Sequence, residues 1–193
     1  MNQTLRRFLI LLLILALSVG FGFAFDGIAD LVERSKYPME PSYASMISEY
    51  ASEFGVPEAI IWAVVYTESG FSSNKVSPDG AVGLMQITPA EMEEIYRLAL
   101  REELPDAGLL YDPRTNLRAG IAQLSALYER YGVWDTVYAA WQVGTEEMDA
   151  WLSTPEHLDE LGQPKGYPDR QTDAFVSQIR KCAAKYTKLY FET

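Results

Sequence analysis

Residues 57–70 read PEAIIWAVVYTESG, an apolar run that begins with proline and ends with a carboxylate and a glycine. Pro57 suits the first turn of a helix, and the apolar residues from Ile60 onward recur at helical spacing. Glu68 follows Val64 by four residues and Ile60 by eight, so it projects from the same buried face, at the last turn. This stretch predicts a core helix that carries one acid on its inner side.

The same periodicity governs the chain on both sides of this helix. It predicts one helix that ends at Gly55, one that follows Pro89 and one that starts near Trp134. Two further helices are predicted from their apolar positions: one through Leu117, Ile121, Leu124 and Tyr128, and one through Phe175, Ile179, Cys182, Tyr186 and Leu189. The alternation typical of strands is absent. We therefore predict an all-α domain over residues 40–193, in which residues 72–83 and 156–167 form long polar loops.

The amino-acid composition limits the classes of protein to which the chain can belong. The chain has 193 residues, of which 48% are apolar, enough for one ordinary core with an appendage. Its formal net charge of −11 argues against nucleic acid, because a phosphate backbone requires a basic surface. The acidic runs are typical of solvated faces.

The first 25 residues resemble a targeting segment. Arg6 and Arg7 precede an uncharged apolar run over residues 8–25, the layout of a signal peptide or a membrane anchor. The run lies at the lower edge of the roughly 20 residues that a spanning helix needs, and we favour an uncleaved anchor. Small residues at Gly22 and Ala24 leave cleavage open. We expect residues 26–39 to be a linker and the rest of the chain to be extracytoplasmic.

The chain has one cysteine, Cys182, and one histidine, His157. These numbers exclude an intrachain disulfide and leave no serine–histidine, cysteine–histidine or multi-histidine zinc constellation. We predict no metal and no cofactor, so any chemistry rests on carboxylates and hydroxyls.

Glu68 is the candidate for that chemistry. A glutamate is rarely buried without a partner, and desolvation raises a carboxyl pKa by up to about 3 to 5 units when burial is complete. A carboxyl group that is protonated near neutrality can donate a proton to a leaving oxygen. The alternative from burial alone is a structural glutamate that anchors a loop.

The residues around Glu68 resemble a known family. Glu68-Ser69-Gly70-Phe71, followed by SPDGAVGLMQ at residues 77–86, is similar to the signature of the soluble lytic transglycosylases, which have a lysozyme-like SLT domain. The similarity continues through Tyr111-Asp112-Pro113 and Asn116, the AWQVG stretch at residues 140–144, and Tyr167-Pro168 with Thr172, Phe175 and Val176. It implies a lysozyme-like transglycosylase domain preceded by the N-terminal signal or anchor helix.

The resemblance implies a reaction on peptidoglycan. Glu68 would protonate the β-1,4 glycosidic oxygen between N-acetylmuramic acid and N-acetylglucosamine, and then act as the base on the muramoyl 6-hydroxyl, leaving a 1,6-anhydromuramoyl end. One carboxylate suffices if the substrate's acetamido group stabilises the cationic state, whereas two-carboxylate glycosidases need a second acid about 5 to 9.5 Å away. Asp79 is the only acid in the nearby loop, and we interpret it as a turn residue in Pro78-Asp79-Gly80.

A set of polar, small and aromatic residues is predicted to bind the substrate: Ser77, Gly83, Met85, Gln86, Tyr138, Trp141, Gln142 and Gln171. Gln86 can donate and accept hydrogen bonds, as sugar hydroxyl and acetamido groups require. Tyr138 and Trp141 lie three residues apart on one helical face, where either could stack on a sugar ring or be ordinary core. For Gly83 the alternative is simple loop flexibility.

Five positions, in two stretches of the chain, depart from the family pattern. Its usual Ala-Tyr-Asn-Ala-Gly reads Ala-Trp-Gln-Val-Gly at residues 140–144, so Trp141 offers an indole N–H where a tyrosine hydroxyl is expected near the catalytic carboxylate. Gln171 replaces a glutamate, and Phe175 replaces a tyrosine. We interpret these changes as tuning of a pKa or of subsite preference, because Glu68 is intact.

Two alternatives stay open. A muramidase-type hydrolase resembling goose-type lysozymes would need a second acid, and a non-catalytic peptidoglycan-binding or scaffold protein could have kept the fold without the activity. The expected partners are peptidoglycan glycan strands and, through the N-terminal segment, the membrane. We expect a monomer.

Overall fold

The structure is a computed structural model that describes residues 3, 6, 11–12 and 27–192. The chain divides into two units, Met1–Pro38 and Met39–Thr193. Apart from residues 3, 6 and 11–12, the predicted targeting segment lies outside the described residues. In the first unit, residues 27–36 are helical, within the stretch expected to be a linker. Among the described residues, none of the helices has both the length and the apolar character needed to cross a membrane.

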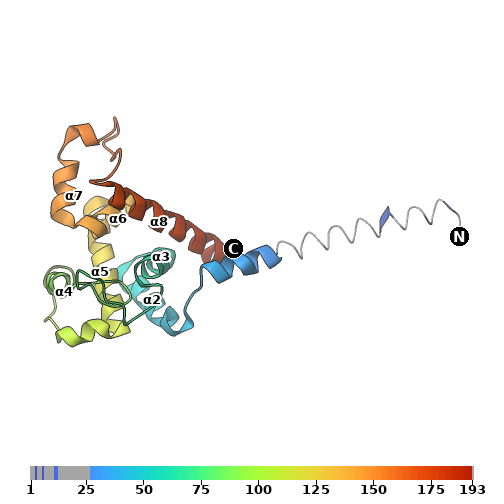
Figure 1. The fold of residues 1–193 in the computed structure, drawn as a ribbon, viewed down its shortest axis with the longest axis horizontal. Coiled ribbons are helices and arrows are strands. Elements are labelled where there is room, and N and C mark those ends of the chain that lie inside the picture. Colours follow the sequence, from blue (N-terminus) through green and yellow to red (C-terminus); the bar gives the residue numbers. More distant parts are fainter. Residues whose placement is uncertain (1–2, 4–5, 7–10, 13–26, 193) are drawn as a thin grey trace. The chain divides into compact units, whose positions relative to one another are not determined.

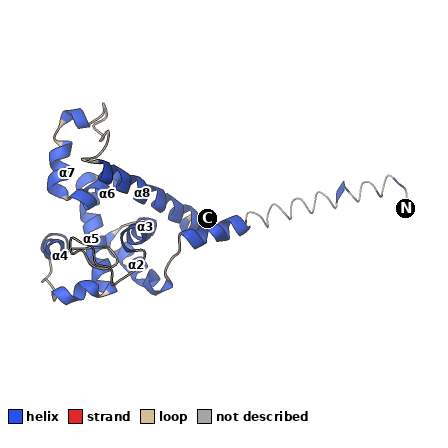
Figure 2. Cartoon of the chain, in the orientation of Figure 1, coloured by secondary structure: helices blue, strands red, loops and turns tan. Residues whose placement is uncertain are grey.

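The second unit is built from helices (Figures 1 and 2). They are α2 (Pro41–Phe54), α3 (Glu58–Ser69), α4 (Pro89–Ile95), the π-helical turn η1 (Tyr96–Leu100), the 3-10 turn η2 (Ala107–Tyr111), α5 (Pro113–Tyr131), α6 (Trp134–Val143), α7 (Thr145–Leu152), the 3-10 turn η3 (Pro155–His157), α8 (Arg170–Tyr186) and the π-helical turn η4 (Thr187–Phe191). Over residues 39–192 the only β-type pairing is in isolated bridges. The predicted all-α class is confirmed.

Helix α3 is the centre of the core. Every residue from Ala59 to Val65 is buried, and Trp62 is fully enclosed. A helix that is apolar on all sides belongs inside a domain, and α3 packs against α2 and α8. Pro57 precedes its first turn, and Gly70, with φ of 58°, ends it in the left-handed conformation. The predicted boundaries of this helix are confirmed.

The other helices pack on this core one after another. Helix α5 packs against α2 and against α6, and α6 in turn packs against α8. Helix α4 also packs against α5.

The loop between α3 and α4 is held in place by one buried side chain. Asn116, on α5, accepts a hydrogen bond from Met85 N at 2.8 Å and donates to the carbonyl oxygens of Val82 and Leu110 at 2.9 and 3.1 Å. At Gly83, with φ of 83°, an added Cβ would lie 2.5 Å from the Asn116 amide nitrogen. The glycine at this position is required by the close approach of loop and helix.

The sequence did not predict α7. The helix expected from Trp134 onward ends at Val143, and Gly144 follows with φ of 84° and ψ of 161°. A residue with a side chain rarely adopts that conformation, so the glycine ends one helix and redirects the chain into the next. This bend places Gly144 and Thr145 beside the candidate site described below.

Candidate active site

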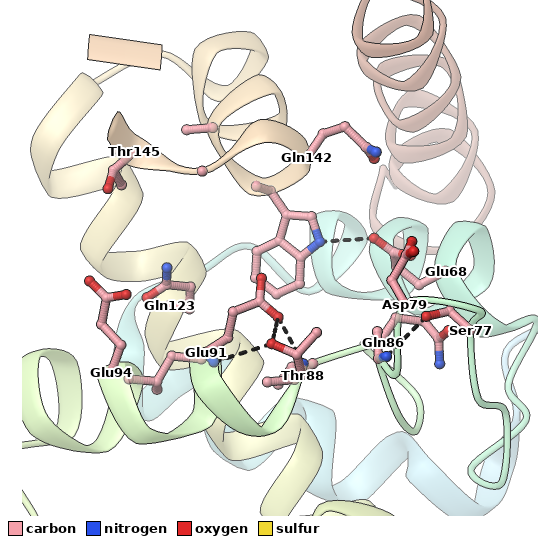
Figure 3. A pocket seen from close by; sticks show the side chains of 16 residues that line it. Glu68, Ser77, Asp79, Gln86, Thr88, Glu91, Glu94, Gln123, Gln142 and Thr145 are labelled. Carbon is pink, nitrogen blue, oxygen red and sulfur yellow. Dashed lines mark hydrogen bonds between the residues drawn. The ribbon is translucent and has the colours of Figure 1, made fainter. Parts of the chain in front are cut away.

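Glu68 lies on the last turn of α3, half-buried, and lines a pocket of about 420 Å³ (Figure 3). Elements far apart in sequence form this pocket: the end of α3, the loop before α4, α4 itself, α5, and the junction of α6 and α7. Its lining residues are Glu68, Ser77, Asp79, Ala81, Gln86, Ile87, Thr88, Glu91, Glu94, Ile95, Gln123, Ala140, Trp141, Gln142, Gly144 and Thr145.

The carboxyl group of Glu68 has one direct polar partner among the described residues. Trp141 Nε1 donates a hydrogen bond to Glu68 Oε1 at 2.8 Å, drawn dashed in Figure 3. The indole N–H therefore reaches the carboxyl at the position where the family resemblance places a tyrosine hydroxyl. Lys75 contacts the main-chain carbonyl oxygen of Glu68, not its carboxyl.

These surroundings raise the pKa of Glu68 to about 7. Burial is the largest cause, because desolvation disfavours the charged form. The Trp141 hydrogen bond and the nearby Lys75 ammonium lower the pKa, and the charge of Glu91 raises it further. Glu68 can therefore hold a proton at a pH at which an exposed glutamate is ionised.

The loop contributes Ser77, Asp79 and Gln86 on the side of the pocket near Glu68 (Figure 3). Gln86 has a left-handed backbone, with φ of 52°, and its side-chain nitrogen donates to the carbonyl oxygens of Gly83 at 2.8 Å and of Lys75 at 3.2 Å. Because both N–H groups are engaged, Gln86 offers its side-chain oxygen as an acceptor. The Ser77 hydroxyl accepts a hydrogen bond from Ala81 N at 2.9 Å.

The opposite side of the pocket carries residues that sequence reasoning missed. Glu94, Gln123 and Thr145 lie there together (Figure 3). Thr88 and Glu91 form a capping box at the start of α4, in which the Thr88 side chain accepts from Glu91 N and the Glu91 carboxylate accepts from Thr88 N. The Thr-x-x-Glu spacing is a recognisable local signal for a helix start. Nothing local marks Gln123, because its position depends on how α5 packs.

Four predicted binding residues are absent from the pocket lining. Met85 is fully buried, and its sulfur lies where a side chain at Gly120 would be, 2.4 Å from a Cβ built there. Tyr138 is 2% exposed and stacks on Trp134 at 6.1 Å between ring centroids, so it is a core residue. Gln171 is an exposed residue in the first turn of α8.

Gly83, the fourth, serves the contact with Asn116. Of the eight residues predicted to bind the substrate, the structure places these four outside the pocket lining, and Ser77, Gln86, Trp141 and Gln142 in it. Among the described residues, no group of three or more histidine, cysteine, aspartate or glutamate side chains could hold a metal ion.

Comparison with known proteins identifies the family. A family model described as the transglycosylase SLT domain matches residues 45–161. The chain belongs to the SLT transglycosylase family. The match includes Glu68 and every residue that lines the pocket, and the predicted family membership is confirmed.

Relatives and solved structures agree with this assignment. The chain is 34% identical, over 90 residues, to membrane-bound lytic murein transglycosylase C of Yersinia pestis strain Pestoides F and of Yersinia pseudotuberculosis serotype O:1b. The matched region is 46% of this chain and 25% of those relatives, so it spans only about a quarter of their length.

The structure of this chain is similar to that of an inactive mutant of lytic transglycosylase Slt from Pseudomonas aeruginosa, with a TM-score of 0.70 and 26% identity. The match covers 80% of this chain and 25% of the other. The 70-kDa soluble lytic transglycosylase of Escherichia coli gives a TM-score of 0.72 at 23% identity, over 83% of this chain and 26% of the other. At that identity the likeness supports the fold alone. The predicted lysozyme-like fold is confirmed.

Proposed function

We propose that this SLT-family chain is a peptidoglycan lytic transglycosylase in which Glu68 is both the acid and the base. The observation that carries the proposal is a single half-buried carboxyl with a pKa raised to about 7, in a pocket large enough for part of a sugar chain. A group that must give up a proton and then take one back works best when its pKa lies near the operating pH.

In the first step, protonated Glu68 transfers its proton to the glycosidic oxygen. The bond between that oxygen and C1 of N-acetylmuramic acid breaks, the N-acetylglucosamine side leaves with the proton, and the substrate's acetamido group stabilises the positive charge at C1. In the second step, ionised Glu68 removes the proton of the C6 hydroxyl while O6 bonds to C1. The 1,6-anhydro ring closes and Glu68 is protonated again, with no water consumed.

The rest of the pocket offers groups suited to an aminosugar chain. The Gln86 side-chain oxygen is an acceptor for a sugar hydroxyl or an acetamido N–H. The amides of Gln123 and Gln142 and the hydroxyl of Thr145 line the remaining wall. We propose that Ser77, Gln86, Trp141 and Gln142 contact the substrate.

The name of the Yersinia relatives places them at a membrane and on murein. Together with the apolar segment over residues 8–25, it supports an extracytoplasmic enzyme that acts on the cell wall and is tethered to the membrane or secreted. The division into a targeting segment at residues 1–25, a linker at 26–39 and a catalytic domain at 40–193 is part of this proposal.

A muramidase-type hydrolase is the second candidate, because three further acids, Asp79, Glu91 and Glu94, line the pocket. Glu91 already caps α4 through Thr88, which counts against it as a free base for water. Product mass separates the two: the full-length chain is incubated with purified peptidoglycan, and the released muropeptides are analysed by mass spectrometry. Anhydro ends, lighter by one water molecule, are expected; hydrated reducing ends alone would indicate a hydrolase.

The non-catalytic alternative is tested in the same assay. The Glu68→Gln variant should release no anhydromuropeptides, whereas Glu58→Gln, on the same helix but outside the pocket, should match the wild type. A wild-type chain that binds peptidoglycan and releases nothing would favour a binding or scaffold protein.

A further inference from the structure

The hydrogen bond between Trp141 and Glu68 differs in kind from the one that the family pattern implies. A tyrosine hydroxyl donates one hydrogen bond and accepts others, and its hydrogen can rotate, whereas an indole N–H only donates. Its direction is fixed by the plane of the ring. In this chain the indole nitrogen, Nε1, lies 2.8 Å from Glu68 Oε1, so that oxygen is held in the role of acceptor.

We propose that Trp141 is a positioning residue that confines the acid proton of Glu68 to Oε2, so that one oxygen of the carboxyl both delivers and recovers the proton. The inference rests on the proposed function of Glu68, and it adds which oxygen reacts and what selects it. It concerns the tryptophan at residue 141, where this chain departs from the family pattern.

The neutral acid can carry its proton on either oxygen, and the indole makes the two unequal. With the proton on Oε2, Oε1 is a carbonyl oxygen, the better acceptor, and keeps the Trp141 bond. With the proton on Oε1, that atom becomes a hydroxyl oxygen, a poorer acceptor, and much of the bond is lost. None of the described residues makes a hydrogen bond to Oε2, which belongs to a side chain that lines the pocket. The proton is therefore placed on the oxygen that no described residue engages and that is left for the substrate.

The fold holds donor and acceptor in register. Trp141 lies in the last turn of α6, and the hydrogen bond from Gly144 N to Ala140 O, at 2.9 Å, closes that turn. Glu68 lies in the last turn of α3. Both helices pack against α8, so the distance between indole and carboxyl is set by packing across three helices, and neither partner lies on a free loop.

Two other charged groups, Lys75 from the loop and Glu91 from α4, act on the carboxyl through space, with no hydrogen bond to it. Asp79 and Glu94 also line the pocket and make no hydrogen bond to it. The remaining polar residues of the pocket from α5 and α6, Gln123 and Gln142, are uncharged. The indole is therefore the only direct contact, among the described residues, that distinguishes one carboxyl oxygen of Glu68 from the other.

The test uses the full-length chain and does not require turnover. The carbonyl stretch of neutral Glu68 is measured by infrared difference spectroscopy against Glu68→Gln, and its pKa is measured by carboxyl ¹³C titration. In Trp141→Phe the stretch should move to higher frequency, because the carbonyl oxygen loses its donor. The pKa should rise by about one to two units, because a hydrogen bond to the charged form is lost.

Trp141→Tyr tests the donor-only character of the indole. A phenol should restore a pKa near that of the wild type, but it should give two carbonyl bands, because its hydroxyl can donate to Oε1 or accept a proton from it. Trp151→Phe is the matched control, since Trp151 donates its N–H to Gly166 O at 3.1 Å, away from the pocket. It should leave the band and the pKa of Glu68 unchanged.

A measurement on the wild-type indole covers the case in which Trp141→Phe does not fold. The Trp141 Nε1–H resonance should shift with a midpoint near pH 7, as Glu68 ionises, and this shift should be absent in Glu68→Gln. The inference is overturned if the carbonyl band, the pKa of Glu68 and the indole resonance all stay unchanged. It is also overturned if Trp141→Tyr gives a single unaltered band. If the spectroscopy gives the expected results but no anhydro product forms, the proposed function fails instead.

Discussion

The two walls of the pocket both carry glutamates, but in different surroundings. On one wall, Glu68 is backed by the buried helix α3, and its pKa is raised to about 7. On the other, Glu91 and Glu94 are exposed on α4, and the carboxylate of Glu91 caps its own helix. The comparison shows that burial and a single N–H donor, not the presence of a carboxylate, distinguish the candidate catalytic acid from its neighbours.

The largest effect is expected from removing the buried acid. Glu68→Gln should lower the rate of anhydromuropeptide release by about 10²- to 10⁴-fold, the range for general acid–base catalysis. Glu94→Gln, on the opposite wall, should change it by less than about tenfold. Rates from a peptidoglycan digestion series measure both, and equal losses would erase the distinction between the two walls.

The next effect concerns the loop that supplies Ser77 and Gln86. Asn116→Ala removes three buried hydrogen bonds, two to this loop at Met85 and Val82 and one to Leu110 in η2. It should destabilise the fold by roughly 2 to 3 kcal/mol, because buried partners are left unsatisfied. Urea unfolding at constant pH measures the change. A midpoint equal to that of the wild type would show that the loop is held by other contacts.

The burial of Glu68 should also make the stability of the fold depend on pH. The pKa of Glu68 is raised on folding, so the unfolded chain loses this proton near its ordinary pKa of 4.5 while the folded chain keeps it until about pH 7. Stability should therefore fall between these values as pH rises and level off above pH 7. Glu68→Gln should be more stable than the wild type at pH 8, by roughly 3 kcal/mol, and similar to it near pH 4. Thermal unfolding at both pH values provides the measurement.

The smallest effect is expected from changing Thr88, the N-cap of helix α4 on the opposite wall. Thr88→Ala removes the side chain that accepts from Glu91 N at 3.2 Å, and it should cost about 1 kcal/mol of stability. The pKa of Glu68 should change little, because Thr88 makes no bond to it. A large pKa change in a carboxyl titration would mean that the cap fixes the distance between the Glu91 charge and Glu68.

Local signals in the sequence were enough to locate the helix that carries the candidate acid. Pro57 and Gly70 marked the ends of α3, and spacing from Ile60 placed Glu68 on its inner face. The position of Trp141 beside Glu68 came from the family pattern. These inferences succeeded because each depends on a few neighbouring residues or on one motif.

The failures depended on contacts that are remote in sequence. Spacing put Tyr138 and Trp141 on one face, but packing buried Tyr138 against Trp134 and left only Trp141 in the pocket. Met85 and Gln86 are adjacent, yet the left-handed backbone at Gln86 separates a core side chain from a pocket side chain. Gln123 could not be identified without knowing how α5 packs.

Gly120 shows how a single absent carbon shapes this site. It lies in the middle of α5, where the sulfur of Met85 fills the space that a Cβ would occupy. An alanine there would crowd the side chain of Met85, the residue directly before Gln86. The pocket wall at Gln86 is thus supported by a position of α5 that does not itself line the pocket.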